Sequence, residues 1–413
     1  MYVKARIIFP ITFILHGLLW HLSIQLFDGE ISIKSIIGEG LSSWVVTVFA
    51  FNFLMATRAK WIERIFGGLD KMYVVHRKGA IIGLVVLLLH FIIVPKAEEM
   101  YPGKPMAFFA FLLILIGVII SVAPPMKKKI RYASWLKIHK TMGPIYTLGV
   151  LHSFFVPTMI SQMPVIRTYT YLFAFVGIGA WIYRAFLYGL FNKKYDYEVD
   201  SANKLTKDTL EVKLKPTNGR MRFKPGQFAF LKFISIENKE IHPFTISSHP
   251  SSEALRFSIK ASGDYTQEIQ EQVMTGTKVK LEGPFGMFDF TSAKYKDQLW
   301  LAGGIGITPF LSFLREVDNS YNIKLAWSVK KMDEAPYHEE ISRISLQKEN
   351  MLYLLQETEK DGFLDPVKFA GNWGKDISVF ICGPLALRTS FMKQLRPKGI
   401  SLKNIHFEEF SFR

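Results

Sequence analysis

The sequence predicts a multi-domain membrane protein in which a six-helix transmembrane bundle is followed by an antiparallel β-barrel and an α/β domain with a parallel sheet. Three observations support this fold class. Apolar runs of about 20 residues, the length that crosses a bilayer, recur up to about residue 190. Short β-like runs then alternate with turns, and from about residue 297 strands alternate with helices. The predicted domains are 1–192, 193–295 and 296–413.

The six predicted spans are apolar stretches that carry few charges. The first stretch lacks a clear small-residue cleavage site and holds His16 and His21, so it is interpreted as a span rather than as a signal peptide. The second stretch is the shortest of the six. The predicted spans are 7–27, 41–57, 77–95, 106–124, 138–156 and 168–190.

The chain has a net charge of +16, and within its membrane region the basic residues are concentrated in two of the connections between spans. They gather within 58–78 and 127–137, whereas the connections 28–40, 96–105 and 157–167 hold few of them. Because basic loops stay on the cytoplasmic side, we expect both termini and the whole region after the last span to be cytoplasmic, in a multi-pass protein of the cell (plasma) membrane. The basic residues are therefore expected to lie at the surface of the lipid bilayer, which is the expected partner. Binding to nucleic acid is not expected.

Cysteine usage restricts the redox chemistry that the chain can support. Cys382 is the single cysteine, which excludes an internal disulfide and an iron–sulfur cluster held by cysteines. The sequence also contains no D-x-[DN]-x-[DN]-G calcium loop, so it gives no indication of a built-in calcium switch.

A glycine-rich turn, "LAGGIGITPF" at 301–310, follows a predicted strand and precedes a predicted helix. Backbone without side chains can approach a pyrophosphate, and the N-terminus of the helix offers unpaired N–H groups to it. A bare turn is the alternative. Thr308 and Pro309 favour the binding interpretation, because proline suits the first turn of a helix. The candidate nucleotide-binding residues here are Gly303, Gly304, Gly306, Thr308 and Pro309.

Two further features of the α/β domain fit a nicotinamide nucleotide. Ser328, Lys330 and Lys331 follow its second strand, where a ribose or a 2′-phosphate would lie, although a solvated loop is the alternative. The cationic side chains favour NADPH, with NADH as the other candidate. The motif "CGP" ends a late strand, at the edge on which open α/β sheets bind ligands. Its residues Cys382, Gly383 and Pro384 are further candidates, although Cys382 could equally be an inert buried thiol.

The predicted barrel carries a candidate flavin site. In "HPFTISS" (242–248), strand alternation puts one set of side chains on each face, which can supply an apolar wall and hydrogen-bonding groups for a flavin ring. Downstream, a helix expected to begin near Thr266 could bind the pyrophosphate of FAD. Ordinary barrel strands are the alternative. The candidate FAD-binding residues are His242, Pro243, Phe244, Thr245, Ser247, Lys260 and Thr266.

Four histidines in the membrane region are spaced as two matched sets. His76 and His90 are 14 positions apart in the third predicted span, and His139 and His152 are 13 apart in the fifth. Each set spans roughly 20 Å of helix, so two neighbouring helices would offer an inner pair (His76, His139) and an outer pair (His90, His152). Two imidazoles can hold the iron of a b-type haem. Isolated, locally satisfied histidines are the alternative.

The fifth predicted span does not fit this arrangement as a straight helix. At about 100° per residue, 14 residues return within about 40° of the starting face, whereas 13 miss it by about 140°. We therefore expect a bend between His139 and His152, for which the proline of Gly143–Pro144 is suited. His16 and His21 have no matched partner span and are interpreted as structural, with a minor role near the outer surface as the alternative for His21.

The order of these motifs, namely HPFTIS, GDYT, GPFG, GGIGITPF and CGP, resembles the ferredoxin–NADP reductase superfamily. With the six spans in front, nearly the whole chain resembles the NADPH oxidase and ferric reductase transmembrane family, and its size is similar to that of the bacterial NADPH oxidases. The resemblance implies FAD in the barrel, NADPH docking across a cleft, and a C-terminal aromatic against the flavin. In "FEEFSFR" the first choice for that catalytic aromatic is Phe410, with Phe412 as the alternative; many relatives end on the aromatic itself.

The expected activity is that of a superoxide-generating NAD(P)H oxidase. It would pass electrons from cytoplasmic NADPH through FAD and two bis-histidine b haems to dioxygen outside, with no obligatory protein partner indicated. A ferric-chelate reductase using the same electron path is the alternative. Two further functions are alternatives. One is a non-catalytic haem-binding membrane module, and the other is a flavin reductase fused to a transport-type membrane domain.

Overall fold

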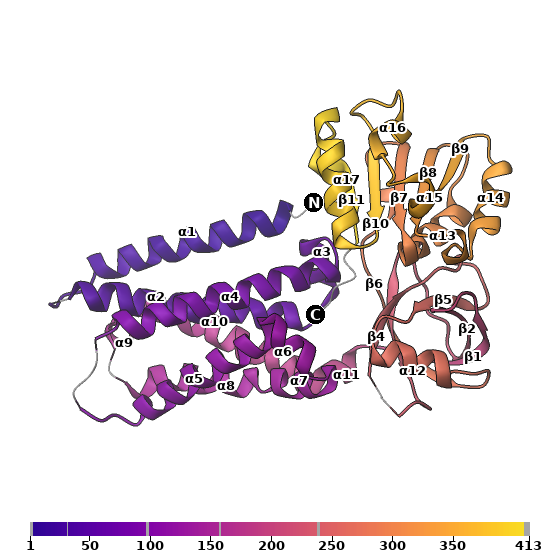
Figure 1. Cartoon of the computed structure of the whole chain (residues 1–413). Coiled ribbons are helices and arrows are strands. Elements are labelled where there is room, and N and C mark those ends of the chain that lie inside the picture. The colour runs from indigo at the N-terminus through magenta and orange to yellow at the C-terminus, as the bar shows by residue number, and fades with distance from the viewer. Residues whose placement is uncertain (1–2, 31, 96–98, 157, 238–239, 409–413) are drawn as a thin grey trace. The chain divides into compact units, whose positions relative to one another are not determined.

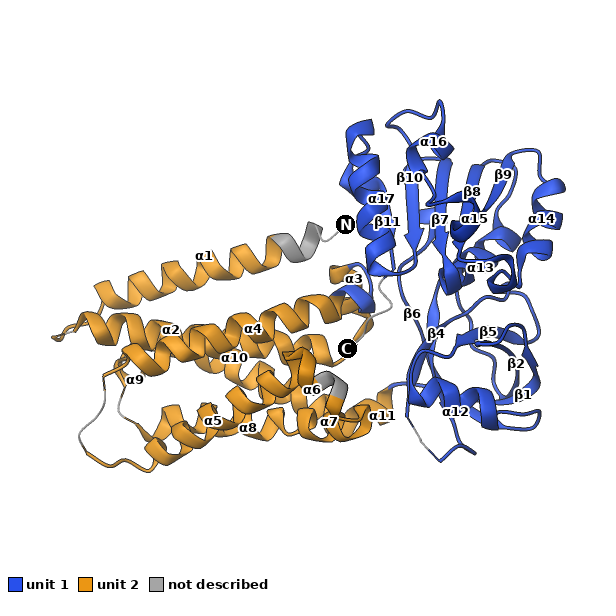
Figure 2. Ribbon diagram, viewed as in Figure 1, with its two compact units in different colours: residues 1, 67–71, 192–413 blue, residues 2–66, 72–191 orange. Residues whose placement is uncertain are grey.

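The computed structural model describes residues 3–30, 32–95, 99–156, 158–237 and 240–408 of the chain. These residues form two compact units, which Figure 2 colours separately. The helical unit comprises the described residues of 3–66 and 72–191, and the sheet unit comprises those of 67–71 and 192–408. Each unit is described by itself below. The boundary between them at Asn192 lies close to the predicted end of the membrane domain.

Long apolar helices dominate the helical unit (Figure 1). Five helices within the described residues are long and apolar enough to cross a membrane, namely those of Ile7–Gln25, Ile33–Ala56, Leu69–Ile93, Gly103–Val122 and Pro164–Phe191. The helices are α1 (Val3–Gln25), α2 (Ile33–Ala56), α3 (Lys60–Phe66), α4 (Leu69–Ile93), α5 (Gly103–Val122), α6 (Pro124–Lys129), α7 (Tyr132–Lys140), α8 (Met142–Phe155), α9 (Met159–Gln162), α10 (Pro164–Ile182), the π-helix η1 (Tyr183–Leu187) and α11 (Tyr188–Phe191).

The predicted fifth span, 138–156, is not one continuous helix. Helix α7 ends at Lys140 and α8 begins at Met142, so the chain is interrupted at Thr141. The interruption lies between His139 and His152, where the spacing of the histidines requires a bend, but it precedes Gly143–Pro144 rather than coinciding with it. The other five predicted spans each overlap a long helix, although α2 and α4 begin eight residues before the predicted starts at 41 and 77.

Small residues allow the helices of this unit to approach closely. Helix α10 packs along α2, and α5 packs along α8. A Cβ added at Gly143 would lie 2.1 Å from the ring of Trp181, and one added at Gly177 would lie 2.8 Å from the ring of Tyr146. Glycines at such contacts are typical of helix packing in membranes, where close van der Waals contact replaces the hydrophobic effect as the force between helices.

The first half of the sheet unit is a nearly closed antiparallel sheet in the order β4-β3-β6-β1-β2-β5. An isolated bridge between Ile246 and Phe257 joins the segment after β4 to β5, which closes most of the gap between the edge strands. Alternating residues of the strands, including Val212, Leu231 and Leu281, fill the interior. The elements are β1 (Lys194–Lys204), β2 (Thr209–Asn218), β3 (Phe228–Phe233), β4 (His242–Thr245), β5 (Leu255–Lys260), α12 (Asp264–Gln272) and β6 (Lys278–Phe285).

The stretch 192–200, which the sequence pattern marks only as a boundary, contains the first strand. Strand β1 begins at Lys194 and pairs with both β2 and β6. Its buried residues Tyr197 and Val199 alternate with charged ones. The period of a half-buried strand is therefore present in this stretch, although its charged residues obscure it.

The second half of the sheet unit is a five-stranded parallel sheet in the order β11-β10-β7-β8-β9. The strands and helices that the sequence predicts for this domain are all present, and the structure adds the strands β9 and β11 and the short helices α15 and α16. The elements are β7 (Asp297–Gly303), α13 (Thr308–Glu316), β8 (Asn322–Val329), α14 (His338–Leu346), β9 (Met351–Glu357), α15 (Thr358–Asp361), α16 (Pro366–Ala370), β10 (Ser378–Cys382), α17 (Leu385–Leu395) and β11 (Ile405–Phe407), with 3₁₀ turns η2 (Phe290–Ser292), η3 (Gly304–Ile307), η4 (Met332–Glu334), η5 (Arg396–Lys398) and η6 (Leu402–Asn404).

Strand alternation divides the core of this domain between the two faces of the sheet. Trp300 of β7 packs with Phe310 and Phe313 of α13 on one face. Leu299 and Leu301, the neighbours of Trp300 along the strand, belong to the other core, which α16 and α17 complete. Helices thus cover both faces, as a parallel sheet requires, and the carboxyl ends of the strands remain as the edge for a ligand.

Candidate functional site

The parallel sheet brings three of the sequence-predicted motifs to one edge. Strand β7 lies between β8 and β10, and its residues Ala302 and Gly303 pair with Cys382 and Ser328 respectively. The glycine turn after β7, Ser328 near the end of β8 and the CGP motif after β10 are therefore neighbours. The carboxyl edge of an open α/β sheet is where such folds bind nucleotides.

Two glycines of this edge have close neighbours, which are backbone at Gly306 and a leucine side chain at Gly303. A Cβ added at Gly306 would lie 2.3 Å from the carbonyl oxygen of Cys382, and one added at Gly303 would lie 2.7 Å from Leu387. Gly304 differs, because a Cβ there would meet open space, but its φ of +53° disfavours other residues. At Gly304 the backbone is thus accessible to a ligand, directly before the N-terminus of α13.

The remaining candidates at this edge differ in exposure. Thr308 and Pro309 are buried in the first turn of α13, where the hydroxyl of Thr308 donates to the carbonyl of Ile305 at 3.1 Å. Ser328 is buried and Lys330 is exposed. A buried hydroxyl followed two residues later by an exposed lysine is compatible with a phosphate-bearing ribose.

The CGP motif combines a buried thiol with an exposed proline. Cys382 is fully buried, with its sulfur 3.8 Å from a carboxylate oxygen of Glu408, and Pro384 is exposed. Burial raises the pKa of the Cys382 thiol well above its usual range, and burial also raises the pKa of Glu408 to about 8. A thiol in this state is a poor nucleophile, which favours a packing role for its side chain. Gly383, with φ of +154°, lies against the backbone of Gly303.

The predicted flavin motif occupies β4 and the segment after it. The ring of His242 stacks on that of Tyr265, with centroids 4.4 Å apart, and its Nε2 lies 2.6 Å from a carboxylate oxygen of Glu240. Pro243 and Phe244 are half-buried, whereas Thr245 is buried. The motif thus presents an apolar, partly exposed surface whose histidine is held in place by its neighbours.

The pyrophosphate part of the candidate flavin site lies at the start of α12, which begins at Asp264. The hydroxyl of Thr266 accepts hydrogen bonds from the backbone N–H groups of Ser262 and Gly263, at 2.8 and 3.0 Å. Gly263 is exposed, and a Cβ there would meet open space. Lys260 is paired with Asp208 at 3.1 Å. The helix start is therefore accessible, as a site for an anionic group requires.

Ser247, another flavin candidate, has its side chain directed elsewhere. It is fully buried, its hydroxyl donates to the carbonyl of Arg256 at 3.1 Å, and the same oxygen accepts from Nε of Arg256 at 3.2 Å. Phe410 and Phe412, the candidates for the aromatic against the flavin, lie outside the described residues.

In the helical unit, three of the predicted ligand histidines have a backbone carbonyl as the partner of Nδ1. Nδ1 of His76 lies 3.1 Å from the backbone carbonyl of Asn52, and Nδ1 of His90 lies 2.8 Å from that of Gly38. Nδ1 of His152 lies 3.3 Å from the carbonyl of Gly103. A carbonyl can only accept, so in each case Nδ1 carries the proton and the lone pair of the imidazole is on Nε2.

The fourth histidine reaches the same tautomer through a hydroxyl. Nδ1 of His139 lies 3.3 Å from the hydroxyl of Ser121, which donates its own proton to the carbonyl of Gly117 at 2.7 Å and accepts from the indole N–H of Trp135 at 3.1 Å. The Ser121 hydroxyl must therefore accept from His139 as well. Metal-binding histidines are typically fixed in this way, with the proton on the nitrogen that faces the protein.

The inner pair also has a separation that fits a shared iron. The ring centroids of His76 and His139 are 6.0 Å apart. Metal–imidazole bonds of about 2 Å on opposite sides of one ion, with about 1 Å from each nitrogen to its ring centre, give about 6 Å. Trp135 stacks on His139 with centroids 5.0 Å apart, which further restricts the orientation of that ring. These residues therefore fit a haem held by two histidines.

The acceptors of these histidines were not identified from the sequence. A backbone carbonyl gives no residue-type signal, but two of the acceptors belong to glycines at close helix contacts. A Cβ added at Gly38 would lie 2.7 Å from Cα of Val94, and one at Gly103 would lie 2.8 Å from the carbonyl of His152. Glycines that face a histidine-bearing helix are thus the signal that could have located them.

Comparison with known proteins matches two parts of the chain to family models. Residues 41–150 match the model described as a ferric reductase like transmembrane component. Residues 195–302 match the model described as an FAD-binding domain. The first match includes His76, His90 and His139, and His152 follows its end by two positions. The second includes the seven candidate FAD-binding residues between His242 and Thr266.

Two curated relatives show the kind of protein that this chain resembles. A superoxide-generating NADPH oxidase heavy chain of Dictyostelium discoideum is 28% identical over 224 residues, which are 48% of this chain and 30% of the relative. Dual oxidase 1 of Sus scrofa is 24% identical over 264 residues, which are 62% of this chain and 16% of the relative. The chain thus spans less than a third of the length of either.

One solved structure shows a related fold. The flavohemoglobin of Malassezia yamatoensis, determined with bound FAD and heme, superposes with a TM-score of 0.52 at 19% identity, covering 93% of this chain and 100% of that one. At this identity the likeness concerns the fold alone, and it agrees with an antiparallel barrel followed by a parallel α/β domain.

Proposed function

We propose an electron path for this chain, a multi-pass transmembrane flavin oxidoreductase that joins a ferric reductase-like transmembrane component to an FAD-binding domain. The path leads from cytoplasmic NADPH through FAD and two b-type haems to dioxygen outside the cell. Per turnover, one NADPH and two dioxygen molecules give one NADP⁺, one proton and two superoxide ions. The plasma membrane is the proposed location, with both termini cytoplasmic, because the basic loops at 58–78 and 127–137 belong on that side.

The observation that carries the proposal is the common tautomer of the four histidines. Each has Nδ1 against an acceptor, so that the lone pair of Nε2 is the one suited to bind iron. We assign His76 and His139 to the inner haem, and His90 and His152 to the outer haem. Isolated structural histidines would each need only some acceptor, on either ring nitrogen, and would not be required to share this orientation.

When bound, FAD accepts a hydride from the nicotinamide and passes on single electrons, which haem iron can carry through a region that excludes water. The chain's own residues bind and orient these groups. His242, Pro243, Phe244 and Thr245 form the wall for the flavin ring, and the start of α12 with Thr266 and the nearby Lys260 serves its phosphates. Phe410 is proposed beside the flavin, with Phe412 as the alternative.

The nucleotide is assigned to the carboxyl edge of the parallel sheet. Gly303, Gly304 and Gly306, before α13, would hold its pyrophosphate, and the CGP motif would border its nicotinamide. Ser328 and Lys330 favour the phosphorylated nucleotide, so NADPH is proposed over NADH. The neighbouring positions of these residues on β7, β8 and β10 support the assignment.

The test is an anaerobic absorption spectrum of the purified full-length protein, loaded with FAD and haem, before and after NADPH. We expect the flavin to bleach and the sharp bands of reduced b-type haem to appear. Bleaching of the flavin without reduction of haem would contradict the electron path. The absence of any haem band from protein supplied with haem would contradict the histidine assignment as well.

The rival activity is reduction of a ferric chelate by the same path, which the description of the transmembrane family model favours. Reduction of cytochrome c in air separates the two. If dioxygen is the acceptor, added superoxide dismutase abolishes the reduction. If dismutase leaves the reduction unchanged, and a ferric chelate is reduced equally fast with and without air, the oxidase proposal is wrong.

A further inference from the structure

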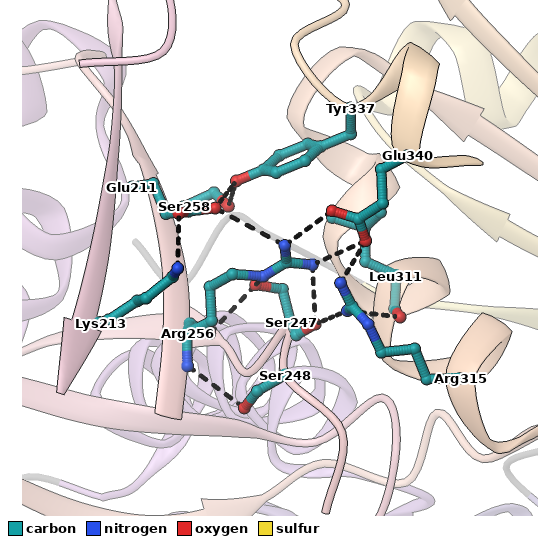
Figure 3. A network of polar contacts seen from close by, with 10 residues as sticks. All are labelled: Glu211, Lys213, Ser247, Ser248, Arg256, Ser258, Leu311, Arg315, Tyr337 and Glu340. Carbon is teal, nitrogen blue, oxygen red and sulfur yellow. Dashed lines mark hydrogen bonds and ion pairs between the residues drawn. The ribbon is translucent and has the colours of Figure 1, made fainter. Parts of the chain in front are cut away.

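A network of charged and hydroxyl groups links the barrel to the α/β domain within the sheet unit (Figure 3). Arg256 of β5 lies at its centre. Glu340 and Arg315 reach it from α14 and α13 of the α/β domain, and Ser247 follows β4 of the barrel. The side chains in Figure 3 point toward one another from these separate elements.

The pairing of Arg256 with Glu340 has two contacts. One terminal nitrogen of Arg256 lies 2.9 Å from one carboxylate oxygen of Glu340, and the other lies 3.4 Å from the second oxygen. Glu340 also pairs with Arg315. A two-contact arginine–carboxylate pair fixes orientation as well as distance, because both groups are planar. The side chain of Arg256 is only 10% exposed, which limits screening by water.

Both arginines also bind the backbone at Ser247. A terminal nitrogen of Arg256 donates to the carbonyl of Ser247 at 3.2 Å, and one of Arg315 donates to the same oxygen at 2.9 Å. A third bond runs from the hydroxyl of Ser312 on α13 to the carbonyl of Ser248 at 2.8 Å. Helix α13 is therefore bonded directly to the segment that follows the flavin motif.

A second set of hydrogen bonds connects the same two domains, next to the contacts of Arg256 with Glu340. The hydroxyl of Tyr337, at the start of α14, donates to a carboxylate oxygen of Glu211 on β2 at 3.1 Å, and it lies 2.6 Å from the hydroxyl of Ser258 on β5. Glu211 is itself 3.6 Å from Arg256. Two arginines and two glutamates are thus collected at the boundary of the domains and their four formal charges balance, while the exposed Lys213 lies 3.9 Å from Glu211 at the edge of the network.

Short, stiff segments connect this network to both candidate ligand sites. Ser247 is two residues from Thr245 of the flavin motif. Arg315 stands on the same helix as Thr308, about 10 Å or two turns along α13, and the glycine turn immediately precedes that helix. A shift at the network would consequently move the nucleotide edge relative to the flavin wall.

We propose that Arg256, Glu340 and Arg315 are positioning residues that hold the nucleotide edge and the flavin wall in one arrangement, and thereby set the rate of hydride transfer from NADPH to FAD. The inference rests on the proposed function. Hydride transfer requires reacting atoms about 3–3.5 Å apart, and a misplacement of 1 Å can cost about a hundredfold in rate. The three residues act through the placement of the domains and do not touch the reacting atoms.

The test is a double-mutant cycle on the full-length protein loaded with FAD, with flavin reduction by NADPH followed in an anaerobic stopped-flow instrument. The variants are Glu340→Gln, Arg256→Gln and the two combined. The matched control is Glu339→Gln, which makes the same change at the exposed neighbouring position. Glu340→Asp, which keeps the charge, tests for rescue.

We expect each single variant to lower the limiting rate of flavin reduction at least about tenfold, with the half-saturating NADPH concentration changed less than about twofold. The combined variant should be no slower than the slower single one, because both remove the same link. Glu339→Gln should match the wild type, and Glu340→Asp should recover most of the rate.

Three results would overturn the inference: an unchanged limiting rate, a raised half-saturating concentration at an unchanged rate, or effects of the two substitutions that multiply in the combined variant. If the Gln variants lose FAD, Arg256→Lys decides, since it keeps the charge but removes the two-contact pairing with Glu340 and should slow reduction severalfold at full FAD content; an unchanged rate there overturns the inference. A wild-type flavin that NADPH does not reduce would instead overturn the proposed function.

Discussion

The helical unit and the sheet unit hold their candidate functional groups in different ways. In the helical unit, each of the four histidines is oriented by a neutral acceptor, three times a backbone carbonyl and once a serine hydroxyl. In the sheet unit, two arginines and two glutamates join the domains that carry the candidate ligand sites. The difference follows from the surroundings of the two units.

A charged group in hydrocarbon costs far more than a neutral one, so a membrane segment has to orient its polar side chains with neutral partners. At the domain boundary of the sheet unit, water at the rim and balanced charges make ion pairs tolerable, and arginine adds directionality. The histidines should consequently respond to changes in helix packing, whereas the domain boundary should respond to pH.

The largest effect is expected when one of the four histidines of the helical unit is removed. His152→Ala should remove the outer haem and abolish reduction of the external acceptor, while NADPH still reduces the flavin. The haem-to-FAD ratio, acceptor reduction and anaerobic flavin bleaching measure the three consequences. Ser153→Ala is the control, because its hydroxyl donates to the carbonyl of Val150 on the same helix. Two retained haems in His152→Ala would refute the ligand assignment.

A glycine substitution tests whether close helix packing orients a ligand. In Gly38→Ala the new Cβ would meet Cα of Val94 at 2.7 Å, so α2 and α4 must separate and the carbonyl that holds His90 moves away. Overpacking of this kind costs about 1–3 kcal/mol. We expect a lower thermal midpoint and partial loss of the outer haem. Gly17→Ala, where a Cβ meets nothing within 4 Å, should change neither.

The hydrogen-bond partner of His139 can be removed while all four histidines are kept, which should have a smaller effect. Ser121→Ala removes the acceptor of Nδ1 of His139 and the partner of Trp135 without changing a ligand. Loss of such an outer partner typically weakens metal binding about tenfold or more. Haem titration of the apoprotein should show one site weakened by about that factor. Ser42→Ala, whose hydroxyl bonds to Glu39 on its own helix, should leave both sites unchanged.

The smallest expected effect concerns pH and the sheet unit. Burial acts to raise the pKa of Glu340, but hydrogen bonding and the charges of Arg256 and Arg315 outweigh it, so the pKa lies below its ordinary 4.5. A carboxyl with a depressed folded-state pKa stabilises the fold above its unfolded-state pKa, and the contribution is lost as the pH falls through the folded value.

The stability advantage of the wild type over Glu340→Gln should therefore be constant near neutral pH and disappear below about 4.5. This stability difference is measured from the temperature at which each protein releases FAD, detected by FAD fluorescence, at a series of pH values. An advantage that persists unchanged in acid would show that the carboxylate charge of Glu340 does not stabilise the domain boundary.

Local patterns made most of the fold predictable. Apolar runs indicated the spans, and turns between short β-like runs indicated a barrel, because both signals are contained within a few neighbouring residues. The glycine turn and the CGP motif, which are about 80 residues apart, could be assigned to one edge because parallel strands share a carboxyl end. Strand β1 was missed, since charged residues flank its buried Tyr197 and Val199.

Long-range pairs and backbone partners were not predictable. Arg256 and Glu340 are 84 positions apart, and nothing in either segment indicates the other. The acceptors at Asn52, Gly38 and Gly103 act through the main chain, which every residue possesses. The interruption at Thr141 also depends on packing, although the uneven spacing of His139 and His152 pointed to a bend somewhere between them.

The fixed tautomer of the four histidines has an electrical consequence for the proposed path. With Nδ1–H committed to an acceptor and Nε2 suited to iron, none of these side chains is available to carry a proton across the bilayer. An electron on the proposed path would then move outward without a proton carried by these four side chains, at a cost or gain of about 2.3 kcal/mol for each 100 mV of membrane potential. Sustained turnover would depolarise the membrane and acidify the interior, so the protein would act as a current source as well as an oxidoreductase.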